Sequence, residues 1–311
     1  MRPLIVARTV VMSAALLALG SWGCSQKETA PSVAAAPAGP PPTPTIEQIR
    51  AATVSGIFEQ AVTLVDGVYH GAPAAPGAAS HPMLDLWEPA IAFGDVDGAA
   101  GNEAVALLGS SAGGSGEMVH VAAFGVRDGV LVNLGTAAVG DRVRLQNLWL
   151  QQGRIIMDVV EAGPGDAACC PTQLARKTYA MEGGALQQVS SEVLGALSIG
   201  ALAAVEWQLV EMNGQPLADG VEAPVIHFEH ASLRGFGGCN RFTAKVSGTA
   251  PGEIDIGPAA ATKMACPEPQ MAIETQFFSQ LEAVDRYSFL AGQLALTFPD
   301  GKNTGRMVFR R

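Results

Sequence analysis

The residues with the most chemical potential in this sequence are four cysteines in two pairs. Cys239 ends the glycine-crowded stretch "GFGGC", and Cys266 lies in "KMACPEP". Cys169 and Cys170 are adjacent in "AACCPTQ". A cysteine can act as a nucleophile, as a metal ligand or as half of a disulfide, and the first two roles need the thiolate. The role therefore depends on the compartment and on the groups nearby.

The start of the chain indicates export. Arg2 and Arg8 flank the beginning of an apolar run, "VVMSAALLALG", which is too short to span a bilayer. Small residues then lead to Cys24 in "GSWGC", so we assign residues 1–23 to a signal peptide. The pattern resembles the signal of bacterial lipoproteins, which implies a lipidated Cys24 that anchors the chain in a membrane. By the same resemblance, Ser25 favours the outer membrane. An ordinary secretory signal that contains a cysteine is the alternative.

Residues 24–45 read as a lipidated cysteine followed by a tether. The stretch "SVAAAPAGPPPTPT" is dominated by proline and alanine, and proline favours extended backbone that lacks amide donors. At about 3.1 Å per residue, such a tether reaches roughly 60 Å from the membrane. The residues that follow suffice for one large domain or two ordinary ones.

Export makes a disulfide the preferred interpretation of Cys239. If Cys24 carries lipid, the five cysteines of the chain leave an even number, as expected for disulfides in an oxidising compartment. A bridge to Cys266, about 27 residues further on, would contribute about 3.5 kcal/mol by the loop-entropy model. A catalytic Cys239 would need a base, and only His227 and His230 could approach it in space. Structural free thiols and a redox role stay open as alternatives.

The adjacent Cys169 and Cys170 allow four interpretations. Soft-metal capture and a redox switch are the functional ones. A vicinal disulfide that fixes the "CCPT" turn and a pair of buried thiols are simpler, and we prefer these two. The paired C-x-x-C spacing of a four-cysteine zinc site does not occur in the sequence.

One acidic segment resembles a calcium loop of the D-x-D-G type. In "GDVDGAAGNE", Asp95, Asp97 and Glu103 offer carboxylates, but Ala99 stands where such loops usually carry a third early acid. Calcium takes six to eight oxygen ligands, so we prefer a plain Asx turn between two strands. We therefore expect neither a metal nor another cofactor.

The elements that must position these residues are mostly strands. In residues 46–193, short apolar runs are separated by "DG", "GG" and "QG" turn signals, which predicts an antiparallel β domain. "RDGVL" is typical of a two-residue hairpin turn. Residues 194–204 read as a linker with a partial helix, and residues 205–311 as a second, smaller domain.

The second domain is predicted to combine a sheet with one helix. "VIHF" alternates, so Ile226 and Phe228 share one face of a strand. His227 and His230 then point to opposite faces, which disfavours a two-histidine metal site. The helix is predicted after "CPEP", because apolar residues recur at four, four and three positions: Ile273, Phe277, Leu281 and Val284.

Residues 205–311 resemble the META domain, the family that includes the HslJ-like heat-shock envelope proteins. The resemblance rests on "WQL", "GFGGCNRF", "AATKMACPE", "ETQFFSQLE" and "QLALTF", in this order. It implies a small β-rich fold with one packed helix and an association with stress and antibiotic tolerance, and it brings no catalytic residues. The first domain resembles an uncharacterised bacterial lipoprotein domain through "FGDVDG", "VGDRVRL" and "GDAACCPTQ", and no activity follows from that.

Together these features predict a mainly β protein with minor α content, anchored in the outer membrane and without enzymatic activity. The net charge of −10 and the lack of a basic stripe argue against nucleic acid as a partner. We expect a role in envelope stress or antibiotic tolerance through binding an envelope protein or a small ligand. The alternatives are a thiol redox or soft-metal protein that uses Cys169 and Cys170, and an inhibitor of a periplasmic hydrolase that uses the exposed loop 109–117.

Overall fold

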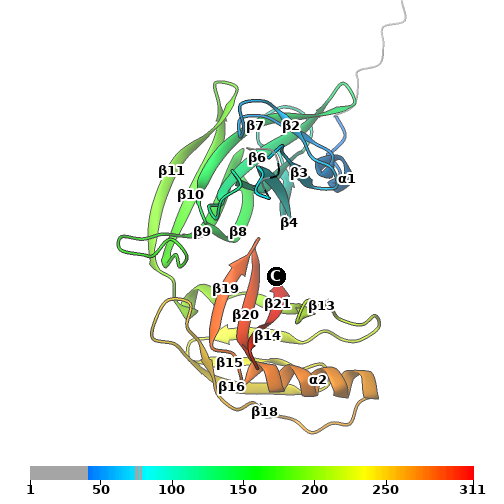
Figure 1. Ribbon diagram of the computed structural model, residues 1–311. Helices are drawn as coiled ribbons and strands as arrows, with labels where there is room; N and C mark the ends of the chain where they lie inside the picture. The colour runs from blue at the N-terminus through cyan, green and yellow to red at the C-terminus, as the bar shows by residue number, and fades with distance from the viewer. Residues whose placement is uncertain (1–40, 74–76, 78) are drawn as a thin grey trace, which may run out of the picture. The chain divides into compact units, whose positions relative to one another are not determined.

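The computed structural model describes residues 41–73, 77 and 79–311 (Figure 1). The predicted signal peptide, the lipidation site Cys24 and most of the tether lie outside the described residues. The predicted fold class is confirmed, because strands dominate and two α-helices accompany them in the described part. In that part, no helix is long and apolar enough to cross a bilayer.

The first sheet is an antiparallel meander of five strands. Its strands in order are β3 (Val68–His70), β4 (Met83–Gly94), β5 (Glu103–Ser111), β6 (Met118–Arg127) and β7 (Val130–Asp141). The central strands β5 and β6 are buried along almost their whole length. Their near-continuous small and apolar residues fit this position, because both faces of the sheet are covered.

A second meander covers one face of the first. It consists of β8 (Arg144–Gln151), β9 (Arg154–Glu161), β10 (Gln173–Glu182) and β11 (Ala185–Ala196). Val105 and Val121 of the first sheet share a core with Met157 and Tyr179 of the second. The opposite face of the first sheet packs on the N-terminal segment, where Ile49 and Leu64 are fully buried. This segment holds α1 (Ile46–Arg50), β1 (Thr53–Val54) and β2 (Val62–Thr63).

The turn predicted at "RDGVL" forms as a two-residue hairpin between β6 and β7. Asp128 and Gly129 both have positive φ angles, of 53° and 78°. Two consecutive positive φ values are the mark of a type I′ turn, whose twist matches that of the flanking strands. The Asp-Gly pair is therefore the local reason why the first sheet folds back here.

The third sheet belongs to the C-terminal part of the chain and contains ten strands. Its main path runs β17 (Asp255–Ile256), β16 (Arg241–Ser247), β15 (Ser232–Phe236), β14 (Val225–Glu229), β12 (Glu206–Met212), β21 (Asn303–Arg310), β20 (Gln293–Asp300) and β19 (Arg286–Leu290), while β13 (Gln215–Pro216) pairs with β12 and β18 (Ala260–Ala261) with β16. The first long strand and the last are neighbours, because Leu209 pairs with Phe309. This pairing closes the unit on itself.

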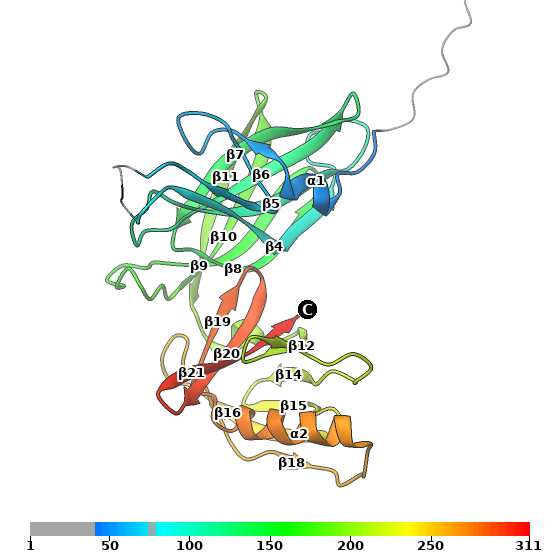
Figure 2. The same ribbon diagram turned by 45° about the vertical axis from the view of Figure 1, so that its right-hand side comes forward.

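The long helix α2 (Glu268–Leu281) lies beside β15 and β16 in both views (Figures 1 and 2). Phe277 and Phe278 of the helix meet the ring of Phe242 in β16, with ring centroids 5.8 and 5.1 Å apart. The predicted helix is confirmed, but it ends at Leu281. Val284 follows the helix and is nevertheless buried in the same core.

The segment between the two predicted domains contains a short helix. β11 continues to Ala196, and a short 3₁₀ helix, η1 (Ile199–Leu202), follows it. The carbonyl of Leu202 accepts a hydrogen bond from the Trp207 indole at 3.0 Å, and both residues are fully buried. The tryptophan of "WQL" thereby fixes the end of this segment to the C-terminal core.

Gly235 in β15 provides a test of the packing between β14 and β15. A Cβ atom at this position would overlap the carbonyl oxygen of Val225, which belongs to the strand backbone and cannot rotate away. We predict that Gly235→Ala lowers the free energy of unfolding by about 2 to 3 kcal/mol, measured by urea denaturation. The matched control is Gly114→Ala, because a Cβ there meets no atom. Equal stability of the two variants would contradict this register.

Candidate functional site

The glycine-crowded turn at residues 237–240 is positioned between β15 and β16. The N–H of Gly237 donates to the carbonyl of Asn240 at 2.8 Å and closes the turn. A Cβ on Gly237 would press on the ring of Phe278 at 2.7 Å, and Gly238 has a φ of +115°. Both positions therefore require glycine, one for space and the other for backbone conformation. The turn places Cys239 and Asn240 under the helix α2.

Glu274 of α2 supplies the anchor of this turn. Its Oε2 atom accepts hydrogen bonds from the backbone N–H groups of Cys239 and Asn240, at 3.1 and 2.5 Å. Its Oε1 atom accepts a third bond from the Asn240 side-chain amide at 2.8 Å. The carboxylate is only 7% exposed, so these three donors replace the water that it loses on burial.

Asn240 also forms hydrogen bonds with residues outside its own turn. Besides its bonds to Glu274, its Oδ1 atom accepts from the N–H of Met264 at 2.7 Å and from the hydroxyl of Thr262 at 2.8 Å. The reason is that the segment before α2 passes directly beside the turn. Asn240 thus joins the turn, the helix and this segment through hydrogen bonds.

The structure joins Cys239 to Cys266, with their Cα atoms 5.9 Å apart. Cys239 also borders a groove of about 820 Å³ that His227 lines as well, so a base is present in the neighbourhood. The sulfur is nevertheless committed to the disulfide, and Cys239 is only 2% exposed. His227 instead lies 3.2 Å from Glu206 through its Nε2 atom. The arrangement offers a covalent link and no free thiolate.

Cys169 and Cys170 lie in the loop between β9 and β10, and the structure joins them as a vicinal disulfide. Both residues are exposed. The base of the loop is held by Asp166, which accepts hydrogen bonds from the N–H groups of Gly163 and Thr172, both at 2.8 Å. The bond from Gly163 is the main reason why the pKa of Asp166 is lowered.

The structure brings Asp95, Asp97 and Glu103 together, with one carboxylate oxygen of each within 4.8 Å of the others. The side chains of Asp95 and Asp97 accept backbone N–H groups of the same turn at 2.8 Å, as an Asx turn requires. Arg127 forms an ion pair with Asp97, and its guanidinium is 3.6 Å from Glu103. Burial raises the pKa of Glu103. Arg127 therefore already supplies a positive charge to these carboxylates. The spacing of residues in the sequence did not reveal this partner.

A second pair that the sequence did not reveal is Ser110 and His120. The Ser110 hydroxyl and the His120 Nε2 atom are 2.9 Å apart on neighbouring strands β5 and β6. Both residues are more than nine-tenths buried, and burial lowers the pKa of His120. Neither residue lines a cavity described here. The pair therefore serves as a satisfied polar contact inside the sheet.

Comparison with known proteins identifies the C-terminal unit. Residues 200–310 match the family model of the META domain. This part of the chain is a META domain. A solved NMR structure of a protein from Burkholderia xenovorans is 22% identical, with a TM-score of 0.30 and coverage of 36% of this chain and 84% of that one.

A second NMR structure is 24% identical to the chain, with a TM-score of 0.30, and the match covers 37% of this chain and 94% of that one. Neither likeness bears on function. No curated protein matches the chain.

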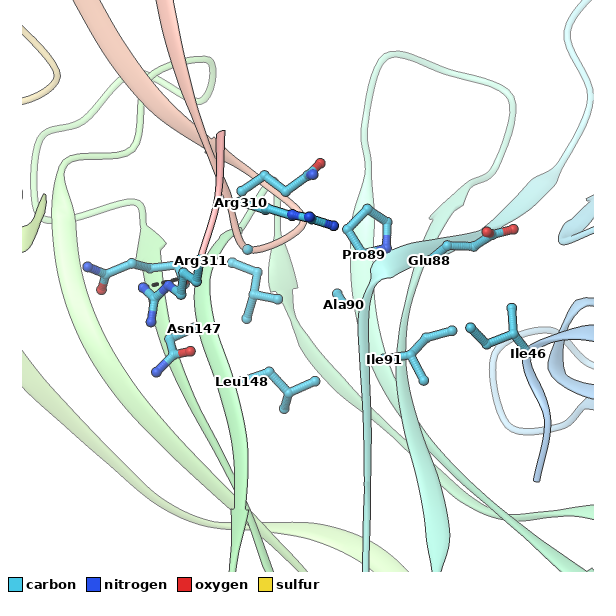
Figure 3. A pocket seen from close by; sticks show the side chains of 13 residues that line it. Ile46, Glu88, Pro89, Ala90, Ile91, Asn147, Leu148, Arg310 and Arg311 are labelled. Atoms are coloured by element: carbon cyan, nitrogen blue, oxygen red, sulfur yellow. Dashed lines mark hydrogen bonds between the residues drawn. The ribbon is translucent and has the colours of Figure 1, made fainter. Parts of the chain in front are cut away.

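Arg310 at the end of the META domain and the next residue, Arg311, line a cavity of about 600 Å³ (Figure 3). Arg310 and Arg311 lie on one side of the view, and Ile46 and Ile91 lie on the other. Further apolar walls come from Leu145 and Leu148, and further polar ones from Gln146, Asn147 and Gln293.

The two arginines have no carboxylate partner among the described residues. Arg310 donates through Nε and Nη2 to the Gln208 side chain, at 3.2 and 2.9 Å. Arg311 donates to the carbonyl of Gln146 at 3.0 Å, and burial lowers its pKa. Glu88, the acid of the opposite wall, is already paired with Arg50 at 2.6 Å. The cavity thus presents positive charge beside apolar walls.

Glu274 provides the test of the turn. We predict that Glu274→Gln lowers the free energy of unfolding by about 2 to 4 kcal/mol. The amide that replaces the carboxylate places an N–H₂ group against one of the N–H groups that now donate to Glu274, and two donors cannot form a hydrogen bond. Guanidinium denaturation measures the change. The control is Glu282→Gln just beyond the same helix, where the exposed carboxylate has one 3.4 Å contact to the Ala259 N–H. A loss no larger than that of the control would contradict the assigned role.

Proposed function

We propose that this protein is a non-enzymatic lipoprotein of the outer membrane that supports tolerance of envelope stress or antibiotics by binding. We further propose that its ligand is a small molecule with an anionic group and an apolar body. The observation that carries the binding part is the cavity in which Arg310 and Arg311 lie beside apolar walls, without an ion pair to any carboxylate of the described residues.

The chemistry of the cavity supports an anionic amphiphile. Its volume of about 600 Å³ lies within the range of small-molecule sites. Arg310 uses two of its donor groups on Gln208, which leaves Nη1 for a ligand. Guanidinium groups favour carboxylates and phosphates, and the Ile46, Ile91 and Leu148 side chains favour an apolar body. The positive charge is local, since the chain as a whole has a net charge of −10.

Three features support the anchored, exported and non-enzymatic parts of the proposal. The apolar run before Cys24 has the pattern of a lipoprotein signal. Two cysteine pairs at disulfide distance fit an oxidising compartment. Two candidate nucleophiles are committed to other contacts, because Cys239 is in a disulfide and Ser110 is buried against His120. The META domain at residues 200–310 is the basis on which we propose the role in stress or antibiotic tolerance.

Membrane anchoring is tested at Cys24. We predict that Cys24→Ser yields a protein without acyl chains that leaves the outer-membrane fraction of a sucrose gradient, because one lipidated residue provides the whole anchor. A strain that depends on this variant should survive heat and antibiotic exposure no better than the deletion strain. The mass of the N-terminal peptide reports lipidation directly.

The matched control is Ser25→Asp, which keeps the acyl chains and moves the protein toward the inner membrane. A wild-type protein without lipid at Cys24, or full tolerance with Cys24→Ser, would contradict the proposal.

Ligand binding is tested at Arg310. With octanoate as the probe, we predict saturable binding by isothermal titration calorimetry and at least about a tenfold loss of affinity in Arg310→Gln, equivalent to about 1.4 kcal/mol. Octanol should bind more weakly than octanoate, because it lacks the charge. Arg306→Gln is the control, since Arg306 is exposed and paired with Glu211 away from the cavity. Equal affinity of wild type and Arg310→Gln would contradict the assigned site.

A further inference from the structure

We propose that the vicinal pair Cys169–Cys170 is a site of thiol–disulfide exchange, and that its reaction partner is an external dithiol. The proposal depends neither on the cavity nor on the lipid anchor. It rests on the exposure of the two cysteines, on their adjacency in the chain and on the way in which the loop around them is held.

The disulfide is open to an attacking thiolate. Residues 167–170 are all exposed and form a turn, in which the N–H of Cys170 donates to the carbonyl of Ala167 at 2.9 Å. Exchange proceeds by attack of a thiolate on one sulfur, so access is the first requirement. The turn projects between the ends of β9 and β10 and provides that access.

Adjacency in the chain makes this bridge easier to reduce than an ordinary one. Its Cα atoms are 3.8 Å apart, as in any two consecutive residues. Most protein disulfides join Cα atoms about 4.4 to 6.8 Å apart, and bridges outside that range are more reducible. Exposed bridges also have less negative reduction potentials than buried structural ones.

The loop can lose this bridge and still keep its shape. Asp166 ties both ends of the loop through its bonds to Gly163 and to the backbone and hydroxyl groups of Thr172. None of these bonds involves a cysteine side chain. The closed ring contains only two residues, so its removal adds little freedom to the unfolded chain. Reduction is therefore a local event.

A basic residue lies in the same neighbourhood. Cys169 and Cys170 line a cavity of about 330 Å³ together with Arg144, the first residue of β8. A nearby guanidinium stabilises a thiolate, which makes a cysteine a better leaving group during exchange.

The exchange proceeds through a mixed disulfide between this protein and the external dithiol. A thiolate of the external dithiol attacks one sulfur of the Cys169–Cys170 bond, a mixed disulfide forms, and the other cysteine leaves as a thiolate that takes up a proton. The second thiol of the external partner then loses its proton and attacks its own sulfur in the mixed disulfide, which releases the remaining cysteine. The pair gains two electrons and two protons, and the dithiol becomes a disulfide.

The chain contains its own reference bridge. Cys239 is 2% exposed, and its backbone N–H is bonded to Glu274. Opening the Cys239–Cys266 bridge releases a loop of 27 residues and therefore costs more stability than opening a bridge between neighbours. A single sample therefore compares an exposed vicinal bridge with a buried long-range one under identical conditions.

The test is a redox titration of the purified protein in buffers with graded ratios of reduced to oxidised dithiothreitol. Samples are quenched in acid, alkylated with N-ethylmaleimide and mapped by mass spectrometry of peptides. We expect Cys169 and Cys170 to be alkylated at ratios at least about tenfold lower than Cys239 and Cys266, which is a difference of about 30 mV for a two-electron couple. The thermal midpoint should change little when only the first pair is reduced.

The control variant is Cys169→Ser/Cys170→Ser, which should lose the easily titrated thiols and keep the thermal midpoint of the wild type. The proposal is overturned if both pairs titrate together or if Cys239–Cys266 is reduced first. It is equally overturned if reduction of Cys169–Cys170 unfolds the protein, or if the pair stays reduced at every ratio.

Discussion

The carboxylate of Glu274 is the contact on which the C-terminal domain depends most. It is buried beneath the turn at residues 237–240. It accepts hydrogen bonds from the backbone N–H groups of Cys239 and Asn240 and from the side-chain amide of Asn240. A buried charge is costly unless it is fully bonded, so this arrangement leaves little freedom in the position of α2. The Cys239–Cys266 bridge then holds the segment before the helix to the same turn. Hydrogen bonds and a covalent bond thus fix the same three parts of the chain.

This arrangement explains why the turn carries residues of reactive types without free reactivity. Asn240 is bonded to Glu274, Thr262 and Met264, and the sulfur of Cys239 is bonded to Cys266. The groups that remain available lie elsewhere. The arginines at the end of β21 line a cavity, and the vicinal cysteines stand on an exposed loop. The residues that hold the fold together and the residues that are free to bind or react therefore lie in different parts of the chain.

Local patterns in the sequence predicted the elements well. Asp128 and Gly129 predicted the hairpin turn, and the spacing of Ile273, Phe277 and Leu281 predicted the helix. Both predictions succeeded because each depends only on residues close together in the sequence. Val284 fits the helical spacing of apolar residues but lies after the helix end. It is apolar because it is buried in the core, and burial after a helix leaves the same pattern in the sequence as burial within it. The sequence pattern therefore could not predict which residue ends the helix.

Side-chain contacts between different strands could not be predicted from one sequence. Arg127 of β6 reaches Asp97 in the turn before β5, and Ser110 meets His120 only because the register of β5 and β6 places them diagonally across the two strands. The role of Glu274 was equally hidden, because an acidic residue on a predicted amphipathic helix is usually solvated. The cavity also escaped prediction, since its walls come from residues as far apart as Ile46 and Arg311.

The most direct test of this account is peptide mapping of the protein purified from the cell envelope, alkylated in denaturant without reductant and then digested without reductant. The account predicts a peptide pair linked through Cys239 and Cys266, with no alkylated form of either residue. Recovery of Cys239 as an alkylated free thiol from the denatured, unreduced protein would contradict it.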